Sequence, residues 1–155
     1  MPQETRPSLT VRRAAPADLD ALVPLFDGYR RFYGRPSDPG LARDFLQQRF
    51  DRSESVVFLA LLGEQAVGFT QLYPSFSSVS AARIHVLNDL FVSERGRRHG
   101  VGKALLAAAI EFGRADGAVR LVLSTGHTNL AAQALYESTG WKRDDENREY
   151  EFSLR

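Results

Sequence analysis

The sequence contains no cysteine among its 155 residues. Disulfide bonds and thiol chemistry are therefore excluded, which suits a reducing cytoplasm. The sequence also has no excess of charge of one sign, because its 20 Lys and Arg residues and 19 Asp and Glu residues give a formal net charge of +1. This balance does not predict nucleic acid or an anionic membrane as a partner. No apolar run approaches the roughly 20 residues of a transmembrane helix, and the first residues lack the features of a signal peptide. We expect a soluble, cytoplasmic protein.

The composition is that of an ordinary globular domain, with 43% hydrophobic and 25% charged residues. A chain of this length buries roughly two-thirds of the surface that its unfolded form exposes. No repeat, low-complexity tract or linker divides it. The polar residues 1–8, which include two prolines, predict a flexible N-terminus, and residues 9–155 predict a single domain.

Hydrophobic periodicity predicts an alternation of strands and helices. Pro24 lies inside the first predicted helix, which begins near Pro16, so this helix is expected to kink or to start later. The prolines, glycines and aromatic residues of 29–40 predict a loop. The expected strands cover residues 9–12, 56–62, 66–73, 83–92, 121–124 and 150–154, and the other expected helices cover residues 41–50, 101–115 and 129–138.

The stretch SERGRRHGVGK, residues 93–103, places several cations and glycines directly before a predicted helix. Positive charge at a helix N-terminus opposes the macrodipole, so the pattern favours a bound polyanion at that end. Unpaired backbone N–H groups at the start of a helix bind phosphate. Gly100 and Gly102 allow the backbone to approach such a ligand, and the arginine side chains can pair with phosphates at its rim.

Two familiar phosphate loops do not fit these residues. The ATP-binding loop requires glycine at position 97 and Ser or Thr at position 104, where the chain has Arg97 and Ala104. The dinucleotide fingerprint requires glycine at position 105, which is Leu105. Taken alone, the stretch is also compatible with a capped surface helix that follows a basic turn.

A second motif favours one family. The pattern Arg97-x-x-Gly100-x-Gly102 resembles the coenzyme A pyrophosphate loop of the GCN5-related N-acetyltransferases (GNAT). The stretch NLAAQALYESTGW, residues 129–141, resembles the second signature of that family, and the two motifs have the right order and separation. The resemblance covers nearly the whole chain. It implies an α/β fold of GNAT type, with a mixed, mostly antiparallel central sheet of six to seven strands flanked by four helices.

The resemblance implies acetyl-CoA as the cosubstrate and no metal. The strand edge at Leu90, Phe91 and Val92 would pair with the pantetheine amides. Asn129 would donate or accept a hydrogen bond with the pantetheine arm, and it is also well suited to cap the helix that follows it. The pyrophosphate cradle would comprise the motif residue Arg97 and the backbone N–H groups of Arg98, His99, Gly100, Val101, Gly102 and Lys103.

Tyr136 would point at the thioester sulfur and act as the general acid, although its position also fits a core tyrosine. A phenol with a pKa near 10 is a weaker acid than a thiol with a pKa near 8.5, so full proton transfer is uphill by about 2 kcal/mol. A hydrogen bond that strengthens as charge develops on sulfur has no such cost. We therefore assign Tyr136 as the donor to the leaving sulfur and Trp141 to packing.

The general base is less evident. Many relatives place Glu or His four residues before the valine that closes the strand, and here that residue is Asn88. Strand alternation predicts that Asp89 faces the opposite side, together with His85. We therefore expect a water chain to bulk solvent, with Asn88 positioning water or substrate. His99 and His127 are expected to be loop residues, and the three histidines lack metal-ligand spacing.

The resemblance implies a primary amine as the acceptor, either a small molecule or a protein amine. Tyr29, Phe32, Tyr33 and Arg35 would form part of its wall, where the aromatic rings either bind an amine by cation–π contact or close the core. The chain looks most like small histone- and polyamine-type acetyltransferases, some of which are dimers, so a homodimer is expected. The alternatives are a non-catalytic acetyl-CoA sensor or interaction module and, more distantly, a nucleotide-binding regulator.

Overall fold

The computed structural model describes residues 5–155, which fall into two compact units that divide after Ser124. Of the predicted flexible N-terminus, residues 1–4 lie outside the described residues, and residues 5–8 are exposed and carry no regular secondary structure. None of the helices within residues 5–155 is long and apolar enough to cross a membrane.

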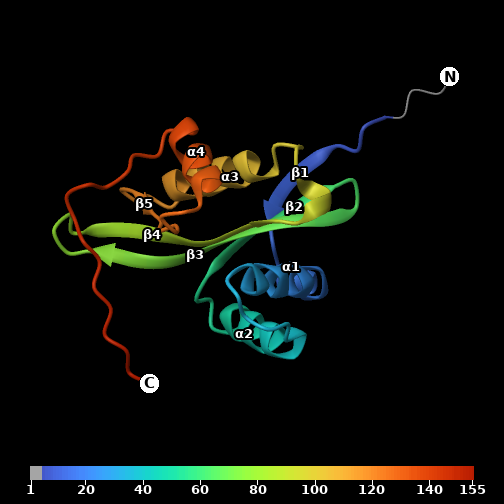
Figure 1. The fold of residues 1–155 in the computed structure, drawn as a ribbon, viewed down its shortest axis with the longest axis horizontal. Coiled ribbons are helices and arrows are strands. Elements are labelled where there is room, and N and C mark those ends of the chain that lie inside the picture. The colour runs from blue at the N-terminus through green and yellow to red at the C-terminus, as the bar shows by residue number, and fades with distance from the viewer. Residues whose placement is uncertain (1–4) are drawn as a thin grey trace. The chain divides into compact units, whose positions relative to one another are not determined.

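The first unit contains one mixed sheet in which the strands follow their order along the chain (Figure 1). Antiparallel pairing joins β1 to β2, β2 to β3 and β3 to β4, whereas β5 joins β4 in parallel. The parallel pair requires a crossover, which α3 (Val101–Ala115) provides. The strands are β1 (Leu9–Arg13), β2 (Val56–Leu62), β3 (Gln65–Ser77), β4 (Ala82–Val92) and β5 (Leu121–Val122).

The predicted α/β class and the four helices are confirmed, whereas the predicted number of strands and their mostly antiparallel pairing differ slightly from the observed sheet. Residues 5–155 form five strands rather than six to seven, in a mixed sheet whose last pairing is parallel. The expected strand at residues 150–154 is absent, and Tyr150, Phe152 and Leu154 are exposed. Alternation makes a strand only where another strand offers a ladder, and α4 (Leu130–Ser138) is the only helix or strand among the described residues of the second unit.

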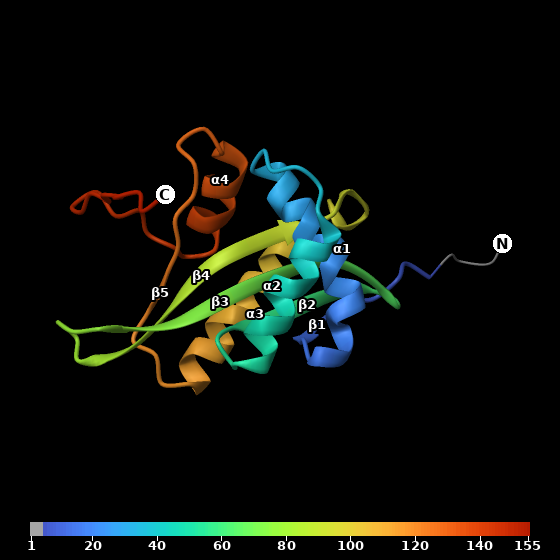
Figure 2. The same ribbon diagram turned by 90° about the horizontal axis from the view of Figure 1, so that it is seen from below.

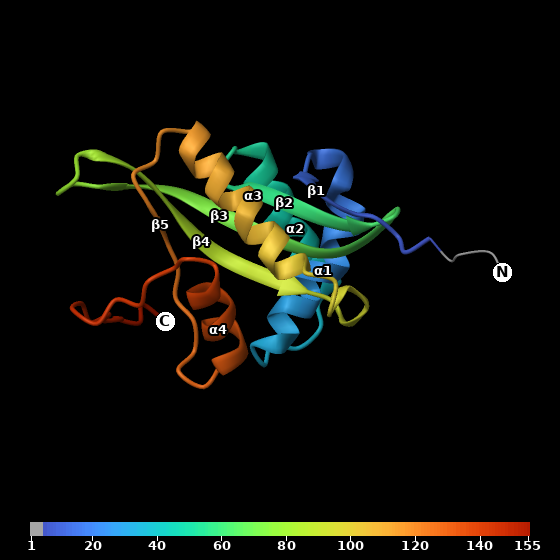
Figure 3. The ribbon, with the colours of Figure 1, turned by 90° about the horizontal axis from the view of Figure 1, so that it is seen from above.

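Helices cover both faces of the sheet. α1 (Leu19–Phe32) and α2 (Pro39–Asp51) pack on one face, and α3 packs on the other (Figures 2 and 3). The α1 face buries a cluster that includes Leu22, Phe26 and Phe69, and the α3 face buries one that includes Val101 and Leu105. The apolar spacing predicted for both helices is therefore confirmed.

The predicted loop at residues 29–40 is shorter than expected, because α1 continues to Phe32 and α2 begins at Pro39. Pro24 lies in the second turn of α1, where it removes a hydrogen bond to the carbonyl of the exposed Asp20 without ending the helix. The buried carboxylate of Asp27 accepts hydrogen bonds from the Ser37 hydroxyl (2.8 Å) and the Asp38 N–H (2.7 Å). These bonds lower the pKa of Asp27 and hold the connecting loop against α1.

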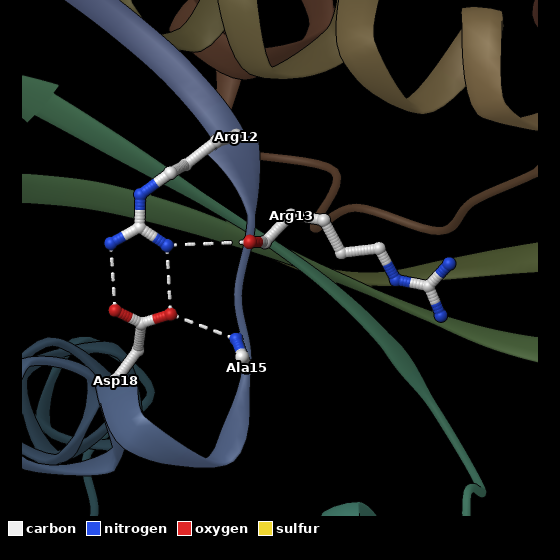
Figure 4. Close-up of polar contacts among 4 residues, drawn as sticks. All are labelled: Arg12, Arg13, Ala15 and Asp18. Atoms are coloured by element: carbon white, nitrogen blue, oxygen red, sulfur yellow. Dashed lines mark hydrogen bonds and ion pairs between the residues drawn. The ribbon is translucent and has the colours of Figure 1, made fainter.

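A carboxylate also fixes the junction between β1 and α1. Asp18 accepts two hydrogen bonds from the Arg12 guanidinium, at 2.7 and 2.8 Å, and one from the Ala15 N–H at 2.8 Å (Figure 4). The same guanidinium donates to the Arg13 carbonyl oxygen. The hydrogen bonds from Arg12, followed by the one from Ala15, lower the pKa of Asp18.

We expect Asp18→Asn to lower the melting temperature by 2–4 °C at pH 7, which corresponds to about 1 kcal/mol in a domain of this size. Because the pKa of Asp18 is lower in the folded state, its contribution is fully present above the ordinary carboxyl pKa and is lost as the pH falls through the folded value. The difference between wild type and variant should therefore shrink below about pH 4.

Asp20→Asn is the matched control, because Asp20 pairs with Arg43 while its own side chain is 89% exposed. An ion pair of this kind contributes little to stability. Thermal melts between pH 2 and pH 8 compare the two variants. Equal losses at pH 7, or an Asp18→Asn deficit that stays constant down to pH 2, would contradict the assigned role of Asp18.

Candidate active site

The basic glycine-rich stretch forms a tight turn that ends in the first turn of α3. Two of its residues adopt left-handed backbone conformations: Arg98 has φ of 66° and Gly100 has φ of 71°. Gly100 precedes the helix, and the first helical hydrogen bond runs from the Ala104 N–H to the Gly100 carbonyl oxygen. The N–H groups before Ala104 therefore have no acceptor within the helix, and such a turn forms an anion-binding concavity.

The space around this turn is open on one side and closed on the other. A Cβ atom built on Gly100 would have nothing within 4 Å, so its backbone can be approached closely. A Cβ on Gly96 would lie 3.0 Å from atoms of Val67 and Val92, and one on Gly68 would lie 2.9 Å from the Val101 side chain. The base of the turn and the start of α3 are therefore packed directly against the sheet.

The C-terminal half of β4 has a free edge beside this turn. Its residues 90–92 pair with Gly68, Phe69 and Thr70 of β3 on one side. On the other side, β5 pairs with β4 only at His85 and Val86, so in the described part of the first unit no strand pairs with this edge beyond Val86. An extended ligand with amide groups could add here as a further strand.

A β-bulge interrupts β4 at Asn88. Gln71 of β3 lies opposite Asp89, and the next residue, Leu72, lies opposite Leu87, which leaves Asn88 as the extra residue. A bulge of this kind changes the face to which the following side chains point. Asp89 consequently lies toward α1, whereas His85 lies toward α3, so the expectation that these two residues share a side is wrong.

Asp89 lies in a polar cluster on the α1 face, and only 1% of its surface is exposed. Its carboxylate accepts hydrogen bonds from the Gln71 side-chain amide (2.6 Å) and the Asn88 side-chain amide (2.8 Å). Burial raises the pKa of Asp89, and hydrogen bonds from Asn88, Gln71 and Tyr29 oppose that rise. Burial, followed by the charge of Asp89, raises the pKa of Tyr29 as well.

His85 occupies a separate place under α3. Its Nε2 lies 2.7 Å from a carboxylate oxygen of Asp116, and its ring contacts Phe112 at a centroid distance of 5.2 Å. Its Nδ1 is buried without a hydrogen-bond partner. This arrangement ties β4 to the end of α3, and the sheet separates His85 from Asp89.

The aromatic residues of α1 divide between core and surface. Tyr29 packs on Phe69 and donates a hydrogen bond to the Asn88 carbonyl oxygen at 3.1 Å. Tyr33 contacts Tyr29 and Phe32 at centroid distances of 5.1 and 5.3 Å, and both Tyr33 and Phe32 are more than half exposed. Tyr29 therefore packs in the core, whereas Phe32 and Tyr33 lie at the surface, and cation–π contact of these rings with an amine stays a prediction.

A glycine sets the distance between α1 and β4. A Cβ atom on Gly28 would lie 2.9 Å from the Phe91 ring. Glycine at position 28 therefore lets the helix that carries the aromatic wall lie close to Phe91 without a shift of its ring.

In the second unit, Asn129 caps α4, because its side chain accepts a hydrogen bond from the Ala132 N–H at 3.2 Å. The capping role that its residue type predicts is confirmed. Tyr136 lies on α4, with its ring centroid 6.1 Å from that of Trp141, and the backbone N–H of Trp141 donates to the Tyr136 carbonyl oxygen. Packing by Trp141 is thus observed within this unit.

Sequence reasoning missed Gln71 and the polar contact of Tyr29. Gln71 interrupts the apolar residues of a predicted strand, which was a signal that a polar partner lies opposite it. The sequence could not identify Asp89 as the partner of Gln71, because the bulge that brings Asp89 to the α1 face depends on the pairing of β3 with β4.

Comparison with known proteins gives consistent matches. Residues 22–141 match the model of the acetyltransferase (GNAT) family. The uncharacterized N-acetyltransferase YhfO of Bacillus subtilis is 45% identical over 136 residues, which cover 88% of this chain and 91% of that protein. A crystal structure of a probable acetyltransferase is 44% identical with a TM-score of 0.88, covering 94% of this chain and 98% of the other. An aminoglycoside N-acetyltransferase in complex with CoA is 19% identical with a TM-score of 0.78, covering 96% and 97% of the two chains.

Proposed function

Because the chain belongs to the acetyltransferase (GNAT) family and is an acyltransferase of that family, we propose that it transfers the acetyl group of acetyl-CoA to a primary amine by direct attack in a ternary complex. The observation that carries this proposal is the turn with Arg98 and Gly100 in left-handed conformations, next to a free β4 edge. The family match spans both units, which supports residues 9–155 as one domain.

The residues of the turn fit a pyrophosphate. The backbone N–H groups from Arg98 through Lys103 would bind its oxygens, and the exposed side chain of Arg97 would neutralise charge at the rim. The edge at Leu90, Phe91 and Val92 would pair with the pantetheine amides, and Asn129 would bind the same arm. The CoA in the complex of a protein with the same fold supports this cosubstrate.

The proton balance defines what the protein must supply. An alkylammonium carries three protons on nitrogen and the amide product retains one, so one proton goes to sulfur and one to solvent. Tyr136 would donate to the leaving sulfur and regain a proton from the nitrogen. An alkylamine with a pKa near 10.4 is neutral in about one molecule in 2,500 at pH 7, a handicap of about 4.6 kcal/mol, so the ammonium must lose its first proton before attack.

The acceptor is a small-molecule or protein amine. Solved structures with this fold include an aminoglycoside acetyltransferase in complex with sisomicin, which supports amines as the acceptor class. The homodimer and the cytoplasmic location stay predictions. A sensor without turnover is the alternative, and Tyr136 favours the enzyme, because a protein that only binds acetyl-CoA needs no donor at the sulfur.

The test is release of free thiol from acetyl-CoA in the presence of a panel of amines. We expect release that requires both protein and amine and that matches the acetylated amine mole for mole, as measured by mass spectrometry. Protein without amine and amine without protein are the controls. Tight binding of acetyl-CoA without turnover of any amine in a panel of aminoglycosides, polyamines, amino acids and lysine peptides would favour the sensor.

A further inference from the structure

We propose that Tyr29 and Asp89 form a proton relay that removes the first proton from the acceptor ammonium, in place of a water chain positioned by Asn88. The proposal rests on the proposed N-acetyltransferase function. It starts from the bulge at Asn88, which brings the Asp89 carboxylate to the α1 face, where Tyr29 packs over β4. The hydrogen bond from the Tyr29 hydroxyl to the Asn88 carbonyl oxygen, across 59 positions of the sequence, places the hydroxyl at the peptide group next to Asp89.

The geometry leaves one route to the carboxylate. Asp89 is 1% exposed, so bulk water does not reach it directly. The side-chain amides of Gln71 and Asn88 donate to it, one to each oxygen, and an amide does not exchange its proton on the timescale of a proton relay. The Tyr29 hydroxyl has one proton and two acceptors within reach, the Asn88 carbonyl oxygen and the Asp89 carboxylate. Tyr29 is half-buried and thus connects this carboxylate to the exposed aromatic wall.

The surroundings of Asp89 suit a proton acceptor. The ionisable groups that act on the Tyr29–Asp89 pair are Tyr33 from α1 and Tyr73 from β3, and Arg49 of α2 acts on Tyr73. Burial raises the pKa of Asp89, which makes the carboxylate a stronger base than an exposed one. The amide donors oppose part of this rise, because they stabilise the ionised form that accepts a proton.

Tyr29 transmits the proton without becoming a phenolate. Burial and the Asp89 charge raise its pKa, so the hydroxyl stays protonated at working pH. In the relay step the N–H bond of the ammonium breaks and a new O–H bond forms on Tyr29, while the original O–H proton passes to Asp89. The neutral amine then attacks the thioester: the C–N bond forms and the C–S bond breaks. After release of the product, Asp89 returns its proton through Tyr29 to solvent.

Tyr29→Phe tests the relay, because it removes the hydroxyl and keeps the ring that packs on Phe69. With the amine that the panel identifies, we expect kcat/KM to fall about 100-fold at pH 7, within the range typical of proton transfer by a positioned group. Acetyl-CoA affinity should be unchanged. The defect should shrink as the pH rises, because neutral amine then comes from solution. Tyr150→Phe is the control, because it removes a hydroxyl from a side chain that is 93% exposed in the second unit, and it should retain its rate within about threefold.

Asp89→Asn gives the second measurement. If Tyr29 and Asp89 act in series, the double variant should be no slower than the slower single variant. Circular dichroism and thermal melts check that each variant is folded. If Asp89→Asn does not fold, the Tyr29→Phe profile from pH 6 to pH 10 decides the question on its own.

The outcomes separate this proposal from the one on which it rests. Turnover of an amine by wild type, with a Tyr29→Phe rate and pH profile that match wild type, overturns the relay and leaves the acetyltransferase in place. A defect in Tyr29→Phe that stays constant across the pH range also overturns it, since a packing role alone would give that result. Failure of wild type to acetylate any amine overturns the proposed function.

Discussion

Tyr136→Phe is expected to lower kcat by 10²–10⁴-fold, or about 3–5 kcal/mol, and to leave the affinity for acetyl-CoA nearly unchanged. The reason is that the hydrogen bond to sulfur strengthens mainly in the transition state, where negative charge develops on the leaving group. Removing only the hydroxyl keeps the ring that lies against Trp141, so α4 should retain its packing. Steady-state kinetics at saturating amine, together with calorimetric titration of acetyl-CoA, measures both quantities.

Two comparisons distinguish proton donation from packing. Tyr150→Phe, in the same unit, removes a hydroxyl from a side chain that is 93% exposed, and it should leave kcat unchanged. The Tyr136→Phe defect should also shrink with an acyl donor whose leaving thiol is more acidic, because that thiolate needs less help. Equal kcat for wild type and Tyr136→Phe with acetyl-CoA would remove Tyr136 from the mechanism.

Gly100→Asp is expected to weaken acetyl-CoA binding at least 100-fold. A carboxylate about 5 Å from one phosphate charge costs about 3 kcal/mol at the effective dielectric constant of a protein surface. The side chain itself has room, because nothing lies within 4 Å of the Cβ position, and Asp is among the residues that adopt a left-handed conformation most readily, so the variant should fold despite backbone strain at φ of 71°. Calorimetry and thermal melts measure the effect. Acetyl-CoA at 100 times its dissociation constant should stabilise wild type by about 2.7 kcal/mol, and this gain should fall to about 0.4 kcal/mol or less in Gly100→Asp at the same concentration.

Gly100→Asn is the matched control. Asn and Asp tolerate the left-handed conformation at φ of 71° similarly and have the same shape, so the two variants differ mainly in charge. We expect Gly100→Asn to bind acetyl-CoA much more tightly than Gly100→Asp. Unchanged affinity in a folded Gly100→Asp would contradict the location of the pyrophosphate. A melting shift of wild type with ATP but not with CoA would instead favour a nucleotide-binding protein.

Local signals in the sequence predicted much of the fold. The apolar stripes of α1 and α3 are buried as expected, and the hairpin of β2 and β3 turns at Gly63, which has a left-handed conformation. The turn at residues 97–100 and the cap at Asn129 were also readable, because each depends on neighbouring residues. These features need no information about distant parts of the chain.

The features that sequence reasoning missed depend on distant partners. The bulge at Asn88 arises from the register between β3 and β4, so strict alternation along the strand wrongly placed Asp89 and His85 on the same face. The same pairing extends β3 to Ser77, four residues beyond its predicted end. At residues 150–154 the alternation was real, but the described residues of the second unit offer no strand to pair with it.

The close approach of Gly28 to Phe91 has an evolutionary consequence. A Cβ atom at position 28 would lie 2.9 Å from the tip of the Phe91 ring, which would have to shift, so substitutions at the two positions are coupled. We expect homologues with alanine or serine at position 28 to carry a smaller residue at position 91. Because the helix carries the aromatic wall and the strand carries the free β4 edge, a lineage that changes this pair would alter the width of the space between them. We therefore expect acceptor preference within the family to vary with the residue pair at positions 28 and 91.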